Sequence, residues 1–396
     1  MYPSNEQIIL LLRAFMSGEP TKLKTAPSDL SAWKEILHLC RIHAIVPMAY
    51  DALSRAENKN ELDNGFLHTF RQEAISKIAV QTARTEEFAR VYSLLEQNGI
   101  SPTVLKGMAL RLLYPKSDCR VSSDEDIFIP SEELAVLKRV LENEGYESGF
   151  ISENGTVIHF MHRDTLLQLE VHTKLFETQA KAGDYAFLFE RQLKTSKRGG
   201  YTVLEETDQL LYLICHAAKH FAMSGFGIRQ ICDIIIFTQK YYDTIDFDLL
   251  LAETERAQLH IFTASLMKIG EEYFEMIKVP EVFEKFARES EPLLCDVFEG
   301  GVFGHSSEER RQSARVTMNT VSGNDKAPVL GTLFPPLADM AVLYPELNTR
   351  PYLLAWYWGV RLIKRGAMRL ISAGKSVSIG KKRSELLKGY GLGKKH

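Results

Sequence analysis

The stretch CRVSSDEDIFIP, residues 119–130, decides the fold, because three acidic residues stand directly before an apolar run that predicts a buried strand. Side chains two apart in an extended strand point to the same face, so Asp124 and Asp126 form a pair and Glu125 points the other way. Two unpaired carboxylates on one face raise each other's pKa and destabilise the fold. A divalent cation reverses that effect, and Mg²⁺ prefers such oxygen ligands.

A third carboxylate candidate lies downstream in LLQLEVHTKLF, residues 166–176. Glu170 interrupts the apolar residues of this predicted strand and shares a face with Gln168 and His172. If the strand lies beside 125–129, Glu170 approaches the aspartate pair, and three carboxylates suit a site for two Mg²⁺ or Mn²⁺ ions. The alternatives are an acidic turn before a strand and a solvent-facing hairpin residue.

Upstream, VLKGMAL at residues 104–110 predicts a strand that ends at Gly107, where a short helix begins. Backbone N–H groups at a helix start attract phosphate, and Lys106 adds a positive charge there. Arg120 precedes the carboxylates by four residues and is expected either to pair with them or to clamp a nucleotide.

The hydrophobic period divides the chain into regions. Residues 1–98 predict a helical N-terminal region, 99–204 an α+β core with a small mixed sheet and flanking helices, and 205–373 a helical C-terminal domain. Residues 374–396 are expected to form a flexible basic tail. The fold class is therefore α+β, helix-rich overall, with a hairpin around Arg163 and Asp164.

Composition excludes several classes of protein. The 396 residues are 45% hydrophobic and carry a net charge of −3, which gives no overall attraction to nucleic acid or membrane. The five cysteines are scattered without a CxxC pair, which argues against zinc and disulfides. No apolar run is long enough to span a bilayer and no signal peptide is evident, so we expect a cytoplasmic protein.

The order of these motifs resembles a bacterial family of uncharacterised nucleotidyltransferases within the polymerase-β-type superfamily. The resemblance covers roughly residues 30–365 and includes TVLKGMALRLLYP, CRVSSDEDIFI, LEVHTKLF and LICHAAKHFAMSGFGIRQICDIIIF. It implies Mg²⁺-dependent transfer of a nucleoside monophosphate from an NTP to an acceptor hydroxyl, with release of pyrophosphate. The acceptor is left open among tRNA, protein, small molecules and sugars.

Carried over to this chain, the resemblance implies that Asp124, Asp126 and Glu170 are catalytic metal ligands. It places Lys106 and Gly107 at the phosphates, and we add Met108, Arg120 and Ser123 to the predicted nucleotide site. Met108 departs from the superfamily pattern, which has glycine or serine after the turn glycine. This departure leaves a catalytically weak nucleotide-binding regulatory module as an alternative.

Further polar residues are predicted to line the cleft. His216 and His220 share one helix face, but a His pair without other ligands is weak evidence for zinc. Asp233 falls in an apolar helix and needs a partner, for which Arg229 is four residues away on the same face. A structural ion pair and a contact with the nucleotide are both open for these residues. His172 is also predicted to line the cleft.

The C-terminal residues 361–396 contain eleven Lys or Arg and a single acid, Glu385. This segment is preceded by Trp356, Tyr357 and Trp358, so weak contact with an anionic surface or RNA is one interpretation. A second alternative function follows, a toxin-like RNA- or protein-binding factor. The favoured interpretation is a docked helix followed by a tail that binds nothing.

Overall fold

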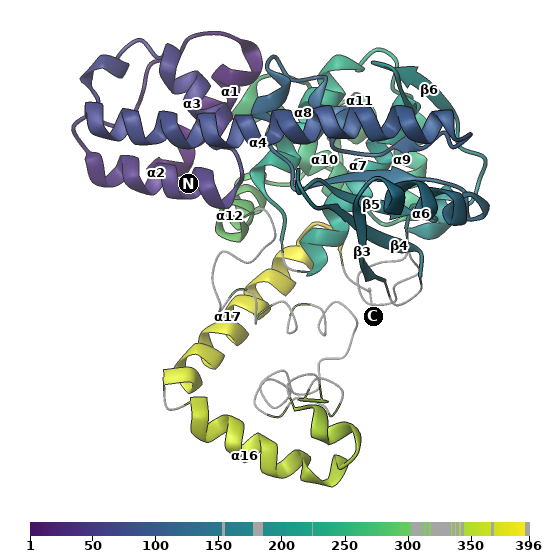
Figure 1. Ribbon diagram of the computed structural model, residues 1–396. Coiled ribbons are helices and arrows are strands. Elements are labelled where there is room, and N and C mark those ends of the chain that lie inside the picture. The colour runs from purple at the N-terminus through teal and green to yellow at the C-terminus, as the bar shows by residue number, and fades with distance from the viewer. Residues whose placement is uncertain are drawn as a thin grey trace.

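The structure is a computed structural model that describes residues 1–152, 155–176, 185–223, 225–301, 344–365 and 368–392, together with positions 310, 313, 317, 334, 337, 340 and 341. A mixed sheet lies beside a helical body, and two C-terminal helices project away from both (Figure 1). The predicted helix-rich α+β class is confirmed.

The sheet contains seven strands in the order β3-β4-β5-β2-β1-β7-β6. The β1–β7 and β2–β5 pairs are parallel and the other neighbours are antiparallel. The predicted hairpin is confirmed, since it joins β4 to β5. The strands are β1 Thr103–Val104, β2 Asp124–Phe128, β3 Tyr146–Ile151, β4 Val157–His162, β5 Gln168–His172, β6 Thr195–Arg198 and β7 Tyr201–Leu204.

Two strands, β3 and β6, were not predicted from the sequence. Both lie at the edges of the sheet, and β3 is exposed at all but its first residue while β6 has the polar sequence TSKR. Edge strands of this kind carry little of the apolar alternation on which strand prediction depends.

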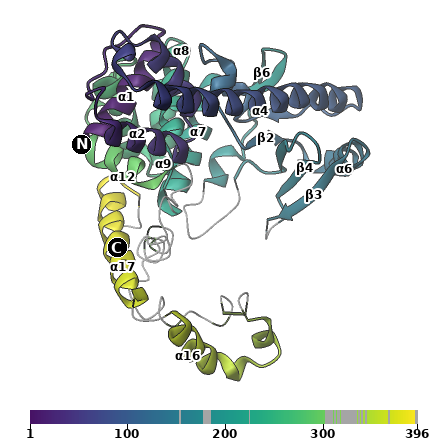
Figure 2. The same ribbon diagram turned by 60° about the vertical axis from the view of Figure 1, so that its left-hand side comes forward.

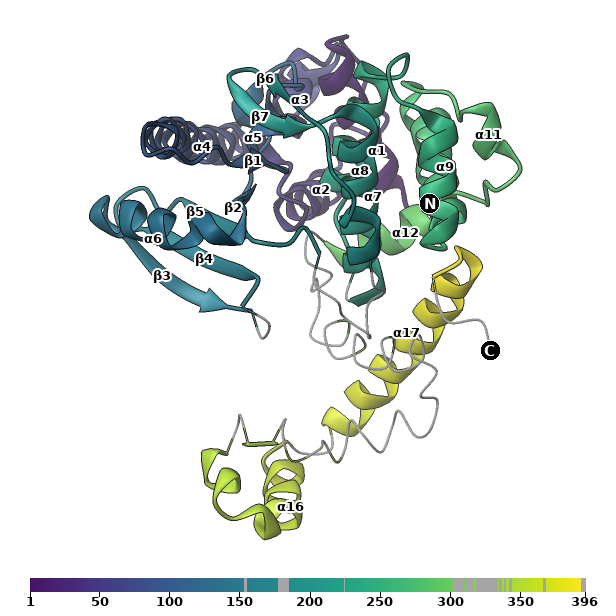
Figure 3. The same ribbon diagram turned by 90° about the vertical axis from the view of Figure 1, so that its right-hand side faces the viewer.

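One face of the sheet packs on two helices, α4 (Asn64–Gln97) and α6 (Leu134–Asn143) (Figure 3). Helix α4 begins at its N-cap Asp63, whose Oδ1 accepts the N–H of Phe66 at 2.7 Å. The covered face takes Ile127 from β2 and Leu169 from β5. Because side chains alternate along a strand, Asp126 and Glu170 lie on the opposite face, which the helical body covers in part.

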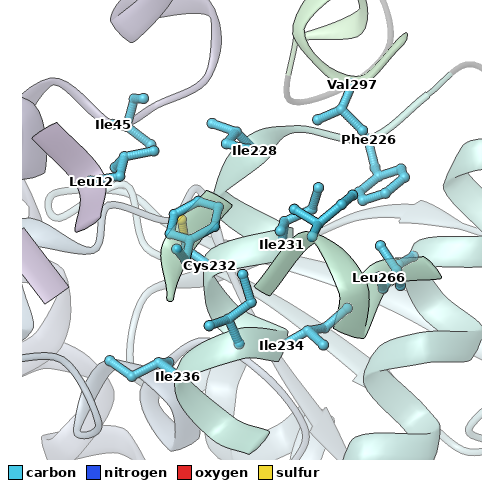
Figure 4. Close-up of a cluster of buried hydrophobic side chains, with 14 of the residues drawn as sticks. Leu12, Ile45, Phe226, Ile228, Ile231, Cys232, Ile234, Ile236, Leu266 and Val297 are labelled. Atoms are coloured by element: carbon cyan, nitrogen blue, oxygen red, sulfur yellow. The ribbon is translucent and has the colours of Figure 1, made fainter. Parts of the chain in front are cut away.

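Helices from both ends of the chain share one hydrophobic core. Leu12 and Ile45 lie beside Ile228, Ile231 and other apolar residues of the C-terminal half (Figure 4). The regions 1–98 and 205–373 are therefore joined by packing. The helices involved are α1 Pro3–Ser17, α2 Leu30–Ile42, α3 Val46–Arg55, α7 Glu206–Met223, α8 Ile228–Lys240, α9 Phe247–Arg256, α10 His260–Ile269, α11 Glu281–Glu284 and α12 Glu291–Gly300.

The basic C-terminal segment differs from the expectation. Residues 374–389, expected to belong to a flexible tail, continue helix α17 (Met368–Gly389), and α16 (Leu354–Arg365) lies at its far end (Figures 1 and 2). The end of α17 is fixed to the body because Arg383 is buried against Asp296 and Leu387 enters the core. Within the described ranges, no helix is both long and apolar enough to cross a membrane.

Candidate active site

Strands β2 and β5 bring two acids from distant parts of the sequence together. They pair in parallel, with Asp126 opposite Glu170 and Asp124 opposite Gln168, which is the arrangement that the predicted approach of Glu170 requires. Ligand atoms of Asp126, Glu170 and His172 all lie within 4.8 Å of one another. Asp124 stands at the start of β2, where its carboxyl is hydrogen-bonded to that of Glu170.

The pKa values of Glu170 and Asp126 are shifted in opposite directions. Burial, and then the charges of Asp126 and Asp124, raise the pKa of Glu170 to about 8. Burial also acts on Asp126, but the Lys106 ammonium and the hydrogen bond from His172 outweigh it and hold the pKa of Asp126 well below its usual range. The positive charge of Lys106 therefore does not fully offset the negative charge of the carboxylates in this cluster.

Glu125, on the covered face, organises the turn at Gly107. Its Oε2 accepts the N–H of Met108 at 2.7 Å, and its Oε1 pairs with the buried Arg111 and accepts from Ser122 Oγ at 3.2 Å. This ion pair anchors the short helix α5 (Met108–Arg111) to β2. The sequence had suggested no role for Glu125 beyond pointing away from the pair.

The prediction that Met108 contacts a nucleotide does not agree with this geometry. Its N–H is already bound by Glu125, and its side chain is buried in the core beneath the sheet. Gly107 and Lys106, in contrast, line the cavity that contains the carboxylates. The turn therefore presents these two residues to a ligand and turns Met108 away from it.

Lys106 connects the acidic cluster to helix α7. Its Nζ lies 2.8 Å from Asp126 Oδ1 and donates to His216 Nε2 at 2.9 Å, while His220 Nε2 lies 3.1 Å from His216 Nε2. Burial lowers the pKa of both histidines, that of His220 to about 4, with the Lys106 charge acting in the same direction. Both rings are therefore neutral at pH 7, so His216 Nε2 can accept a hydrogen bond from the Lys106 ammonium.

The predicted ion pair between Arg229 and Asp233 is wrong. Asp233 is paired with Arg120, whose Nε and Nη2 lie 2.6 and 2.8 Å from the two carboxylate oxygens, and Tyr114 donates to the same group at 2.7 Å. A bidentate guanidinium from the loop before β2 thus outcompetes the neighbour on the same helix. Arg229 donates instead to the carbonyl of Val121.

Arg120 lines the cavity, but its Nε and Nη2 are engaged by Asp233 and its Nη1 donates to the carbonyl of Gly107 at 3.4 Å. Ser123 is exposed, and its Oγ donates to Asp124 Oδ1 at 3.0 Å. Its neighbour Ser122 lines the cavity instead.

The cavity has a volume of about 220 Å³, and β2, β5, the Gly107 turn, α7 and α8 form its walls. It brings together all three predicted carboxylates, His172, both helix histidines, Arg229 and Asp233. Tyr212, which also lines it, was missed in the sequence. The signal was present, because residues 212, 216 and 220 recur at the four-residue spacing of one helix face.

The donor set fits a hard divalent cation. Among the described residues, Asp126, Glu170 and His172 form a group of acidic and histidine side chains whose ligand atoms are close enough to bind one metal ion. Asp124 lies next to this group. Two or more carboxylate oxygens suit Mg²⁺ or Mn²⁺. The mutual repulsion that raises the pKa of Glu170 is what a bound cation would relieve.

A mixed sheet that carries clustered acids beside a glycine turn is the arrangement of a nucleotidyltransferase. The description "Uncharacterised nucleotidyltransferase" belongs to a family that matches residues 29–275, and this chain is a member of that family. Its membership implies a nucleotide substrate. Searches of curated proteins and of solved structures found no match.

Proposed function

We propose that this protein transfers a nucleoside monophosphate from an NTP to an acceptor hydroxyl. The observation that carries the proposal is the pairing of Asp126 with Glu170 on the sheet face opposite α4 and α6, with Asp124 beside them and the Gly107 turn in the same cavity. Family membership supports the same class of reaction. The acceptor oxygen forms a bond to the α-phosphorus, and the bond from that phosphorus to the β-phosphate bridging oxygen breaks, which releases pyrophosphate.

The metal ligands in this proposal are Asp124, Asp126 and Glu170, which would hold Mg²⁺ or Mn²⁺. When bound, such ions neutralise negative charge on the phosphates and align the reacting oxygens. His172 donates its Nε2–H to Asp126 Oδ1 at 3.2 Å and so keeps that carboxylate facing the cavity.

The remaining groups of the site act by position and charge. The Lys106 ammonium lies within the cavity and can move from Asp126 to a phosphate oxygen when the carboxylate gains another cation. Gly107 lines the same cavity, so the backbone of the turn can lie against a phosphate. In this proposal Glu170 is the metal ligand or the base closest to the acceptor hydroxyl, and a bound cation would keep its carboxylate ionised.

The test is transfer of label from α-labelled ATP, GTP, CTP or UTP to a cell extract, with and without Mg²⁺. We expect Mg²⁺-dependent labelling of one fraction and release of pyrophosphate, both lost in the Asp124→Asn/Asp126→Asn protein. Glu147→Gln is the matched control, since Glu147 is an exposed acid on β3 that pairs with Arg163. Fractionation of the product into RNA, protein, sugars and small molecules identifies the acceptor class.

One observation favours a second candidate, a module that binds nucleotides without transferring them. The N–H of Met108 is occupied by Glu125, so the turn offers a nucleotide one donor fewer. Such a module would bind an NTP in a Mg²⁺-dependent manner, as titration calorimetry can measure, yet would label nothing in the extract. Metal-independent, Asp-independent binding would contradict both candidates.

A further inference from the structure

Arg229 on helix α8 is a buried cation without an anion. Its side chain lines the cavity and is only 9% exposed. It makes no recorded ion pair with a described carboxylate, and its Nε has no hydrogen-bond partner among the described residues. One of its terminal nitrogens donates to the carbonyl of Val121.

The charges of Asp233 and Asp124 only partly offset the effects of burial and Arg120 on the pKa of Arg229. Asp233 is the acid nearest in sequence, but both of its oxygens accept from Arg120 and one also accepts from Tyr114. This wall of the cavity therefore carries two guanidinium groups and one carboxylate, and Arg120 is the group paired with that carboxylate. Burial and the charge of Arg120 lower the pKa of Arg229, consistent with an uncompensated cation.

Burying an uncompensated charge costs several kcal/mol in a protein, so such groups are kept where a ligand completes them. The missing partner must be an anion that can accept from the free guanidinium nitrogens. Phosphate oxygens suit this planar donor group well.

We propose that Arg229 binds the terminal phosphates of the nucleotide substrate, and then the pyrophosphate that leaves. This inference rests on the proposed function for the identity of the ligand. The α-phosphate must lie at the carboxylates of β2 and β5, where the bond is exchanged. Arg229 belongs to a different wall, formed by α8, so the phosphates that reach it are those further along the chain.

The link to Val121 supports the same assignment. Val121 lies three residues before Asp124, so one guanidinium holds both the terminal phosphates and the segment that leads into the acidic strand. Arg229 is thus a binding residue that also positions β2.

The experiment measures tripolyphosphate, ATP and AMP binding by calorimetry, without Mg²⁺ and at fixed salt. We expect Arg229→Met to weaken tripolyphosphate and ATP binding roughly 10- to 100-fold, the size of a lost charged hydrogen-bond pair. AMP binding should change far less. Arg229→Lys, which keeps the charge but loses the planar fork, should fall between the wild type and Arg229→Met.

Arg84→Met is the matched control. Arg84 donates to the adjacent carbonyl, Ser122 O, at 3.1 Å, and its Nε also lacks a partner among the described residues, but it does not line the cavity. Thermal unfolding of each variant verifies folding, and the conservative Arg229→Lys protein still tests the proposal if Arg229→Met does not fold.

Three results would overturn the assignment. The first is that the wild type does not bind tripolyphosphate, and the second is that Arg229→Lys and Arg229→Met both bind it as tightly as the wild type. The third is that Arg229→Met loses as much affinity for AMP as for ATP. The Asp124→Asn/Asp126→Asn protein separates this proposal from the function on which it rests. It should keep metal-free tripolyphosphate binding. If that binding depends on Arg229 while no protein transfers label, the phosphate site stands and the transfer reaction does not.

Discussion

The Oε2 atom of Glu125 occupies the space that a side chain on Gly107 would need, because a Cβ atom built there lies 1.8 Å from it. Gly107 also has φ of +54°, a conformation that favours glycine. The carboxylate at this position is not a flexible end, since it pairs with the buried Arg111. The turn and the strand β2 are therefore built as one unit.

Gly107→Ala should lower the free energy of unfolding by roughly 3 kcal/mol or more, because it strains the backbone and displaces a buried ion pair. The control is Gly99→Ala, at φ of +78° with no atom within 4 Å of the added Cβ. That variant should lose only about 1 kcal/mol from backbone strain. Urea unfolding measures both, and equal losses would show that the contact with Glu125 is unimportant.

Lys106 occupies the place of a cation beside Asp126, at 2.8 Å from its Oδ1. Lys106→Gln should therefore strengthen Mg²⁺ binding, by roughly tenfold if about 1.4 kcal/mol of competition is removed. The rate of nucleotidyl transfer should nevertheless fall at least about tenfold, because a phosphate loses its cation. Calorimetry and the labelling assay measure the two effects.

Lys174→Gln is the control for Lys106→Gln, because Lys174 also lines the cavity but is exposed. Its Mg²⁺ affinity should stay close to that of the wild type. Weaker Mg²⁺ binding by the Lys106→Gln protein would contradict the idea that the ammonium competes with the metal.

Burial, and then the like charges of Asp126 and Asp124, raise the pKa of Glu170 to about 8. Since a raised carboxyl pKa favours the protonated form in the fold, this group destabilises the metal-free protein as pH rises from 4.5 toward 8. Glu170→Gln should therefore raise metal-free stability at pH 8, by about 4 kcal/mol, while abolishing both transfer and stabilisation by Mg²⁺. Thermal scans with and without Mg²⁺ check this, and a less stable variant would contradict it.

The face of the sheet that carries the carboxylates could be predicted because it depends on local alternation. The spacing of Asp124 and Asp126 assigns both side chains to one face, and the interruption of an apolar strand by Glu170 marks that residue as exceptional. The glycine at residue 107 could be recognised in the same way, from the change of period that follows it.

The partners of Arg120 and Glu125 could not be predicted, because they depend on tertiary packing. Helix spacing offers Arg229 as the neighbour of Asp233, yet the loop before β2 delivers Arg120 with better geometry from 113 positions away. Glu125 likewise pairs with Arg111, which follows the turn and is fully buried. Helix spacing identifies possible ion-pair partners that are close in sequence. It does not show whether a residue from a distant part of the chain takes their place.

A double-mutant cycle tests the partner of Asp233. Asp233→Asn and Arg120→Met should show a coupling energy of about 3 kcal/mol, as expected for a buried bidentate pair. Asp233→Asn and Arg229→Met should be coupled by less than about 1 kcal/mol. Chemical denaturation supplies the four free energies of each cycle, and stronger coupling to Arg229 would reverse the assignment.

His43 links the N-terminal helices to the C-terminal body and should make stability depend on pH. Its Nε2 donates to the carbonyl of Phe298 at 3.2 Å and its Nδ1 accepts from the N–H of Ile228 at 3.4 Å, so the ring is neutral in the fold. Burial lowers its pKa from 6.5 to about 4, and the charge of Arg310 acts in the same direction.

Because the unfolded chain binds the proton more tightly, the contribution of His43 to stability is complete above pH 6.5 and is lost as pH falls toward 4. The loss should reach about 3 kcal/mol. Urea unfolding of the wild type and of His43→Gln between pH 4 and 8 gives the free energy of unfolding of each protein as a function of pH. The difference between the two is the contribution of His43. His68→Gln, at an exposed position of α4, should keep the wild-type pH dependence. A constant difference between wild type and His43→Gln across this range would show that the His43 ring does not titrate on unfolding.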